Sequence, residues 1–155
     1  MSNKKIKIFI CYPHKGAKKF LDELLSVLKA RSHEISHIAY FSDNNIKPGD
    51  LTHDVIQEKI IDSNISIVFI SQKTFESDYI IKTELPLIKE VFDYGDIKRI
   101  CPLRIDDYQI FDGGNFEWLN KIQFVNQDKP LRDIGEKERF NIYYELVKLI
   151  VNVSS

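Results

Sequence analysis

Apolar residues gather in five short runs along the 155-residue chain, separated by segments in which apolar positions recur at helical spacing. The runs are rich in β-branched residues and bounded by polar or turn-forming ones, which is typical of buried strands. The segments between them predict amphipathic helices. We expect strands at residues 5–11, 37–41, 65–71, 99–105 and 122–125, and helices at residues 18–31, 51–63, 77–90 and 134–151.

This alternation of strand and helix predicts an α/β fold with a mostly parallel sheet covered on both faces. Five strands fit a flavodoxin-like three-layer fold with a five-stranded parallel sheet in the order 2-1-3-4-5. The length suits one domain over residues 1–155,. That domain is either a small free-standing protein or a piece of a longer sensor-effector protein.

Ligands of such folds bind beyond the carboxyl ends of the strands, where the strand order reverses. At that edge the predicted fold gathers the loops after the first three strands, residues 12–16, 42–50 and 72–79. The third loop leads into a predicted helix. Around its axis, Glu84 falls near the middle of an apolar face formed by Ile80, Ile81, Leu85, Leu87, Ile88, Val91 and Phe92,. A buried, unpaired carboxylate costs several kcal/mol. Glu84 therefore either projects into a pocket, or caps a helix, or pairs with a lysine at the surface.

Pro86 bears on the same helix, because a proline in a helix interior removes a backbone hydrogen bond,. We expect one of two outcomes. The helix either kinks at Pro86, or begins late, with Thr83 as its cap and Pro86 in its first turn.

Composition excludes several classes of function. The formal charge of −1, without a basic stripe, argues against nucleic-acid binding,. No apolar run approaches the roughly 20 residues of a membrane span, and the amino terminus enters a strand pattern without a signal peptide, so we expect a cytoplasmic protein with no membrane contact. Cys11 and Cys101 lie in strand-like runs, which favours reduced core thiols over a disulfide. Neither has a metal-ligand neighbour at a suitable spacing, and we predict no metal site.

Three motifs in order then point to one family. The stretch IFICYPHKG (8–16) is similar to a strand ending in F-I-S-Y-S and followed by a polar loop. The stretch YFSDNNIKPGD (40–50) is similar to a strand with F-x-D that runs into a loop ending in I-x-P-G. The stretch FISQKTFESDYIIKTEL (69–85) is similar to a strand-ending serine followed by S-x-W-C-x-x-E-L. Together they resemble the first two boxes and the glutamate-bearing segment of a Toll/interleukin-1 receptor (TIR) domain, and the resemblance covers nearly the whole chain.

The resemblance implies an activity. Many bacterial, plant and some animal TIR domains cleave the nicotinamide-ribose bond of NAD⁺, and their essential glutamate matches Glu84. NAD⁺ would then be the substrate, with no separate cofactor. The matching loops imply a set of substrate-binding residues: Tyr12, Pro13, His14, Phe41, Asp43, Ser71 and Tyr79. The second loop implies a segment that gates the pocket or joins neighbouring TIR domains: Asn44, Asn45, Ile46, Lys47, Pro48, Gly49 and Asp50.

The chain departs from the family pattern at four positions within the matching motifs. Cys11 and Pro13 stand where serines are usual, Tyr79 replaces the tryptophan and Ile80 the cysteine. Tyr79 retains an aromatic face that can stack on a nucleotide base. Ser71 has two interpretations, as a cap for the next helical turn or as a ribose contact.

We expect an NAD⁺ glycohydrolase, the effector of a bacterial anti-phage immune system, activated by homotypic TIR–TIR assembly through an attached or separate sensor. The alternative is a non-enzymatic adaptor that acts through homotypic protein–protein interaction. A response-regulator receiver would need an acidic pair after the first strand, where Cys11, Tyr12 and Pro13 stand instead. A nucleoside deoxyribosyltransferase also uses a glutamate on a comparable fold and stays open as an enzyme alternative.

Overall fold

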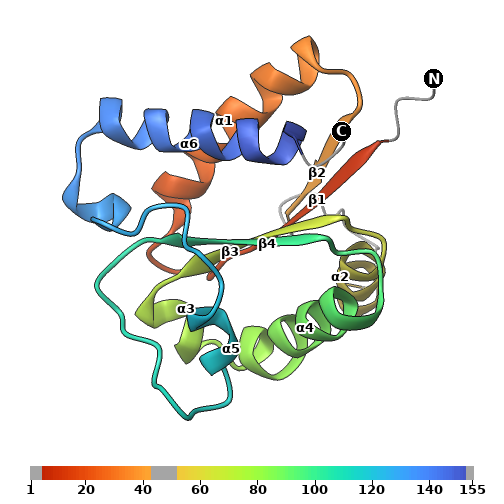
Figure 1. Cartoon of the computed structure of the whole chain (residues 1–155), viewed down its shortest axis with the longest axis vertical. Helices are drawn as coiled ribbons and strands as arrows, with labels where there is room; N and C mark the ends of the chain where they lie inside the picture. The colour runs from red at the N-terminus through yellow and green to blue at the C-terminus, as the bar shows by residue number, and fades with distance from the viewer. Residues whose placement is uncertain (1–4, 43–51, 153–155) are drawn as a thin grey trace.

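A four-stranded parallel sheet forms the centre of the protein in the computed structural model, which describes residues 5–42 and 52–152 (Figure 1). Its strands are ordered β2-β1-β3-β4, and each neighbouring pair is parallel. This confirms the expected parallel α/β fold and the order 2-1-3-4. The strand bounds are β1 (Ile6–Cys11), β2 (Ile38–Phe41), β3 (Ile65–Ile70) and β4 (Arg99–Arg104).

Helices cover both faces of the sheet and complete the three layers (Figure 1). The long helices α1 (Lys18–Glu34) and α6 (Glu136–Asn152) lie on one face. The other face is covered by α2 (Thr52–Ile61), α3 (Gln72–Glu76), α4 (Leu85–Tyr94) and α5 (Glu117–Asn120). Within the described ranges, no helix combines the length and the apolar character needed to cross a membrane.

Strand β3 runs through the middle of the core, and all six of its residues are buried. Successive side chains of a strand point to opposite faces. Accordingly Ile65, Ile67 and Phe69 join the apolar cluster beneath α1 and α6. Val68 and Ile70 join the separate cluster beneath α2 and α4. The sheet therefore divides the interior into two cores, one for each helical layer.

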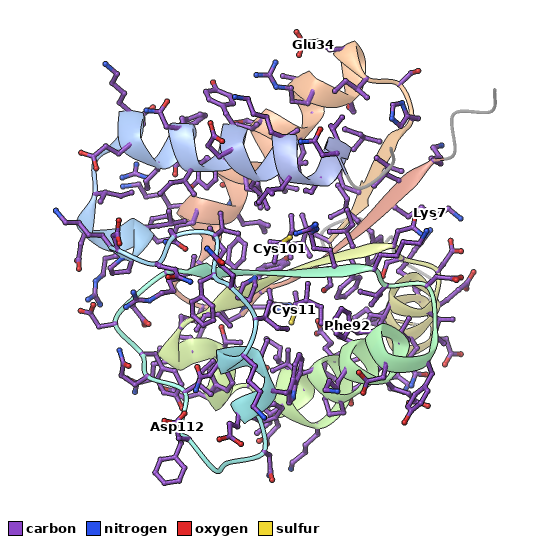
Figure 2. The ribbon with its side chains drawn as sticks, in the orientation of Figure 1. Lys7, Cys11, Glu34, Phe92, Cys101 and Asp112 are labelled. Carbon is purple, nitrogen blue, oxygen red and sulfur yellow. The ribbon has the colours of Figure 1, made fainter. Side chains whose placement is uncertain are left out.

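The two cysteines lie on opposite sides of this sheet (Figure 2). Cys11, at the end of β1, packs in the core beneath α2 and α4, whereas Cys101 of β4 packs in the core beneath α1 and α6. The sheet between them excludes a disulfide that joins one to the other. Burial raises the pKa of the Cys101 thiol to about 11, which keeps it protonated at neutral pH,.

The prediction of a fifth strand at residues 122–125 is wrong. The segment runs beside β4 but does not form the regular backbone hydrogen bonds of a strand pair. Val125 N–H donates to the Pro102 carbonyl at 2.9 Å, and Pro102 has no N–H to return,. The next outward-facing backbone groups, on Arg104, bond to the side chain of Asn126 instead. Its Oδ1 accepts from Arg104 N–H at 2.8 Å, and its Nδ2 donates to the Arg104 carbonyl at 2.9 Å. A buried amide side chain thus replaces a strand at this edge,.

The expected helix at residues 77–90 is divided into two parts: a π-helical turn spans Ile80–Glu84, and α4 begins at Leu85. The single-turn helix α3 precedes both, in the segment predicted as a loop. Pro86 lies in the first turn of α4, as one of the two expectations required,. Thr83 does not cap this helix, because it lies inside the π-turn and the helical backbone continues through it.

A buried polar cluster joins α1 to α6. The Arg139 guanidinium donates from Nε and Nη2 to the two carboxylate oxygens of Glu23, both at 2.8 Å, and the Tyr143 hydroxyl donates to the same carboxylate at 2.7 Å. The Arg139 and Glu23 side chains are only 7% and 14% exposed. The hydrogen bonds from Arg139 hold the pKa of Glu23 below its usual value, against the effect of desolvation,. The cluster fixes the layer of helices opposite α2 and α4.

Replacing Glu23 with glutamine is expected to lower the free energy of unfolding at pH 7 by about 2 kcal/mol, because it removes charge-assisted hydrogen bonds to a buried guanidinium. The depressed folded-state pKa means that the carboxylate stabilises the protein above its ordinary pKa of 4.5 and loses this effect as the pH falls through the lower folded-state value,. Urea unfolding at several pH values measures the difference.

The difference in the free energy of unfolding between wild type and Glu23→Gln should become smaller at acidic pH. Glu34→Gln, which alters an exposed ion pair of the same helix with Arg31, is the matched control and should change little,. A gap for Glu23→Gln that stays constant from pH 7 to pH 3 would contradict this assignment.

Replacing Asn126 with alanine is expected to cost about 2 kcal/mol, because it leaves the N–H and carbonyl of Arg104 without their side-chain partner,. Asn120→Ala is the control, since Asn120 is exposed and its side-chain amide donates to the Ile110 carbonyl and to Asp112. Chemical denaturation compares the two. Equal, small effects would show that the edge of β4 does not depend on the Asn126 amide.

Candidate active site

A cavity of about 470 Å³ opens at the carboxyl edge of the sheet, where the sequence predicted a site,. The loops after β1 and β3, the first turns of α2 and the π-turn before α4 contribute its walls. Its described lining residues are Tyr12, Pro13, His14, Lys15, Thr52, Ile56, Lys73, Glu76, Ser77, Tyr79, Ile80 and Glu84.

Glu84 lies at the inner side of this cavity. It is 7% exposed, and two residues of the same helical segment, Ile80 and Leu85, are buried in the core beneath α2 and α4. The carboxylate nevertheless lines the cavity. Glu84 thus lies at a pocket, which is one of the expected alternatives, and its catalytic role stays a prediction.

The π-turn sets the direction of Glu84. Leu85 N–H donates to the carbonyl of Ile80, five residues back instead of four. Such a turn accommodates one additional residue in an otherwise α-helical path. In the motif S-x-W-C-x-x-E-L the glutamate follows the tryptophan by four positions, whereas Glu84 follows Tyr79 by five. The π-turn absorbs this extra residue and keeps both side chains at the cavity.

The loop after β1 forms the opposite wall. The rings of Tyr12 and His14 are stacked, with centroids 5.7 Å apart, and Tyr12 also contacts Phe69 of β3. Tyr12 is buried, whereas His14 is exposed at the mouth. Gly16 ends the loop with a φ of 76°, a left-handed backbone conformation that residues other than glycine rarely adopt,. Tyr12, Pro13 and His14 all lie where the sequence predicted.

Ser71 acts as a helix cap. Its hydroxyl accepts a hydrogen bond from Thr74 N–H at 3.2 Å, and the Thr74 hydroxyl donates to the Phe69 carbonyl at 2.7 Å. This is one of the two expected roles. Ser71 is not among the described residues that line the cavity, and its contact with ribose stays a prediction.

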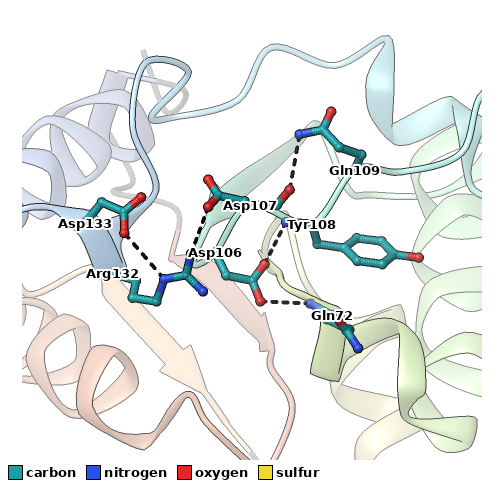
Figure 3. Close-up of polar contacts among 7 residues, drawn as sticks. All are labelled: Gln72, Asp106, Asp107, Tyr108, Gln109, Arg132 and Asp133. Atoms are coloured by element: carbon teal, nitrogen blue, oxygen red, sulfur yellow. Dashed lines mark hydrogen bonds and ion pairs between the residues drawn. The ribbon is translucent and has the colours of Figure 1, made fainter.

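A second contact fixes the start of α3 from the neighbouring strand (Figure 3). The Asp106 carboxylate, just beyond β4, accepts from Gln72 N–H at 3.1 Å and from Tyr108 N–H at 3.0 Å. The start of α3 is therefore bonded both to Ser71, which follows β3, and to Asp106, which follows β4. These contacts fix the backbone that carries Lys73 and Glu76, the two side chains of α3 that line the cavity.

Charge at the mouth of the cavity is mixed. Lys73 Nζ lies 3.2 Å from Glu76, which also accepts from the Gln72 amide at 2.9 Å. The hydrogen bond from Gln72 lowers the pKa of Glu76, and the ammonium groups of Lys73 and Lys15 act in the same direction,. Among the described residues no cluster of three or more His, Cys, Asp or Glu side chains is arranged to hold a metal ion.

Tyr79 stands immediately before the π-turn and lines the cavity while half-buried. Its hydroxyl lies 3.0 Å from Nδ1 of His53, on the first turn of α2. The two rings meet edge to face, with centroids 5.8 Å apart.

Two groups of predicted residues remain. Phe41, at the end of β2, stacks on Phe9 at 5.9 Å and faces Lys59, away from the described lining of the cavity. Asp43 and the expected gating segment (Asn44, Asn45, Ile46, Lys47, Pro48, Gly49 and Asp50) lie outside the described residues.

Sequence reasoning missed several residues around the cavity. Lys15, Lys73, Glu76 and Ser77 belong to the two loop regions that were predicted to border the site, so their position was a usable signal. The residues that α2 contributes had no such signal, because only the folded structure brings this helix beside Tyr79. They are Thr52, His53 and Ile56.

Comparison with solved structures supports the same fold. The TIR domains of the activated Roq1 resistosome, which directly recognizes the pathogen effector XopQ, match with a TM-score of 0.72 at 16% identity, covering 94% of this chain and 99% of that chain. The RPS4 and RRS1 TIR domain heterodimer matches with a TM-score of 0.57 at 13% identity, covering 96% and 97%. The TIR domain of the Toll-related receptor TRR-2 from Hydra magnipapillata gives 0.54 at 19% identity, covering 92% and 96%.

No curated protein sequence matches the chain. A family model described as a TIR domain, however, matches residues 8–137, which include all three motifs and Glu84. The strand order, the motifs and this match agree, and the chain belongs to the TIR domain family.

Proposed function

We propose that this TIR domain is an NAD⁺ glycohydrolase that uses Glu84 as its catalytic carboxylate. The observation that carries the proposal is the position of Glu84, 7% exposed on a largely apolar helix and yet lining the cavity at the carboxyl edge of the sheet. Its place in the motif matches the essential glutamate of TIR domains that cleave NAD⁺. A carboxylate whose burial costs free energy is a candidate for a functional role.

The chemistry needs only one carboxylate. The bond between ribose C1′ and the nicotinamide nitrogen breaks, and its electron pair neutralises the pyridinium as nicotinamide leaves, so no general acid is required. Ordinary glycoside hydrolysis, by contrast, uses a pair of carboxylates. Water then bonds to C1′ and releases a proton to solvent, which gives ADP-ribose. Glu84 stabilises the oxocarbenium-like transition state electrostatically.

The rest of the cavity suits a dinucleotide. Tyr12, His14 and Tyr79 offer aromatic faces on which a planar base can stack,. Lys15 and Lys73 place two ammonium groups at the mouth, where Glu76 offsets part of their charge. A pyrophosphate complements such a pair of cations.

We further propose that the protein is a cytoplasmic effector of bacterial anti-phage immunity, switched on when an attached or separate sensor brings TIR domains together. The RPS4 and RRS1 TIR domains form a heterodimer, and the Roq1 TIR domains belong to an activated resistosome, so assembly of TIR domains has precedent in the fold. We therefore expect the isolated chain to have low activity. A non-enzymatic adaptor is the alternative that the following experiment excludes or supports.

Replacing Glu84 with alanine or glutamine is expected to reduce nicotinamide release from NAD⁺ at least 100-fold, because the transition-state charge loses its counter-ion. Chromatography of the products measures release by concentrated protein, or by protein clustered through a terminal tag on a lipid surface. Glu90→Gln is the matched control: it removes an exposed carboxylate from α4, away from the described lining of the cavity, and should keep activity within about threefold of wild type.

Retention of activity by Glu84→Gln would contradict the catalytic assignment. A clustered wild type that releases no nicotinamide would instead support the adaptor.

A further inference from the structure

His53 contacts the candidate active site from outside. It lies on the first turn of α2, exposed to solvent, and is not among the described residues that line the cavity. Its Nδ1 lies 3.0 Å from the Tyr79 hydroxyl, within a hydrogen bond in which either group can donate according to the histidine tautomer,. The rings meet edge to face at 82°, a favourable arrangement for aromatic pairs,.

This contact restrains the orientation of the Tyr79 ring. Tyr79 is held through its backbone at the entrance to the π-turn, and its half-buried ring packs against the core beneath α2 and α4. A hydrogen bond to the far end of the ring, together with the edge-to-face contact, selects one orientation. Because α2 and α4 pack beside each other, His53 supplies this restraint from a separate element of the fold.

We propose that His53 is a positioning residue that holds the Tyr79 ring in place as a wall of the cavity for the planar base of the substrate. The inference rests on the proposed function and adds to it a residue that none of the three TIR motifs contains. A wall fixed in advance lowers the entropy lost when a base stacks on it. Such stacking acts on bound substrate and transition state alike, so His53 affects KM and leaves kcat nearly unchanged.

A purely structural role makes a different prediction. If the contact only joined α2 to the π-turn, its loss would lower the melting temperature and leave substrate affinity unchanged in the molecules that stay folded. The exposure of His53 favours the first role, because an exposed hydrogen bond adds little to stability,.

The test measures KM and kcat for nicotinamide release by the clustered protein and, independently of turnover, the Kd of NAD⁺ by calorimetry in the Glu84→Gln background. His53→Ala and Tyr79→Phe each remove the hydrogen bond from one side, and His53→Asn keeps a polar atom near the Nδ1 position. His33→Ala, at an exposed histidine in the last turn of α1, is the matched control. Melting temperatures identify variants that do not fold.

We expect His53→Ala and Tyr79→Phe each to raise KM and Kd about two- to tenfold, with kcat within twofold of wild type. The double variant should be no weaker than either single one, because both remove the same interaction. His53→Asn should restore most of the affinity, and His33→Ala should change nothing.

Unchanged KM and Kd in His53→Ala, or single effects that multiply in the double variant, would overturn the positioning role of His53. Neither result would affect the proposed function. Protein that neither releases nicotinamide nor binds NAD⁺ would overturn the proposed function itself, and the role of His53 with it.

Discussion

The buried carboxylate of Glu84 is the constraint around which the carboxyl edge of the sheet is organised. A helix that packs Ile80 and Leu85 into the core would ordinarily carry an apolar residue between them,. A carboxylate there costs free energy unless a cavity gives it access to solvent or ligand. The cavity at the carboxyl edge of the sheet provides that access. The π-turn maintains it, because it absorbs the residue that would otherwise rotate Glu84 out of line with Tyr79.

The remaining architecture makes this edge rigid. The parallel strands β1 and β3 bring their following loops to the same side of the sheet. Ser71 and Asp106 fix the start of α3 from two strands. On the far side, the buried Glu23 cluster joins α1 to α6, and Asn126 satisfies the exposed edge of β4. These contacts lie outside the cavity, and their effect on a site is to hold its walls within the narrow tolerances that catalysis requires.

Much of this could be predicted from the sequence. The β-branched runs gave the strands, their alternation with helices gave the parallel sheet, and the helical wheel drew attention to Glu84. The fifth strand was not predictable, because an apolar run does not reveal that Pro102 lacks an N–H or that the Asn126 side chain takes the place of a ladder. The π-turn was likewise missed, since local propensity does not distinguish it from an α-helical turn. His53 depends on packing between distant segments, to which neither periodicity nor motif spacing is sensitive.

The proposed activity requires that the cavity beside Glu84 bind the nicotinamide-ribose half of NAD⁺. The most direct test is a nuclear magnetic resonance titration of isotope-labelled Glu84→Gln protein, which we expect to bind without turnover, with NAD⁺, ADP-ribose and nicotinamide. We expect NAD⁺ to shift the resonances of Tyr12, His14 and Tyr79, with smaller changes from either fragment alone. Shifts confined to residues away from this cavity, or no shifts at millimolar NAD⁺, would contradict it.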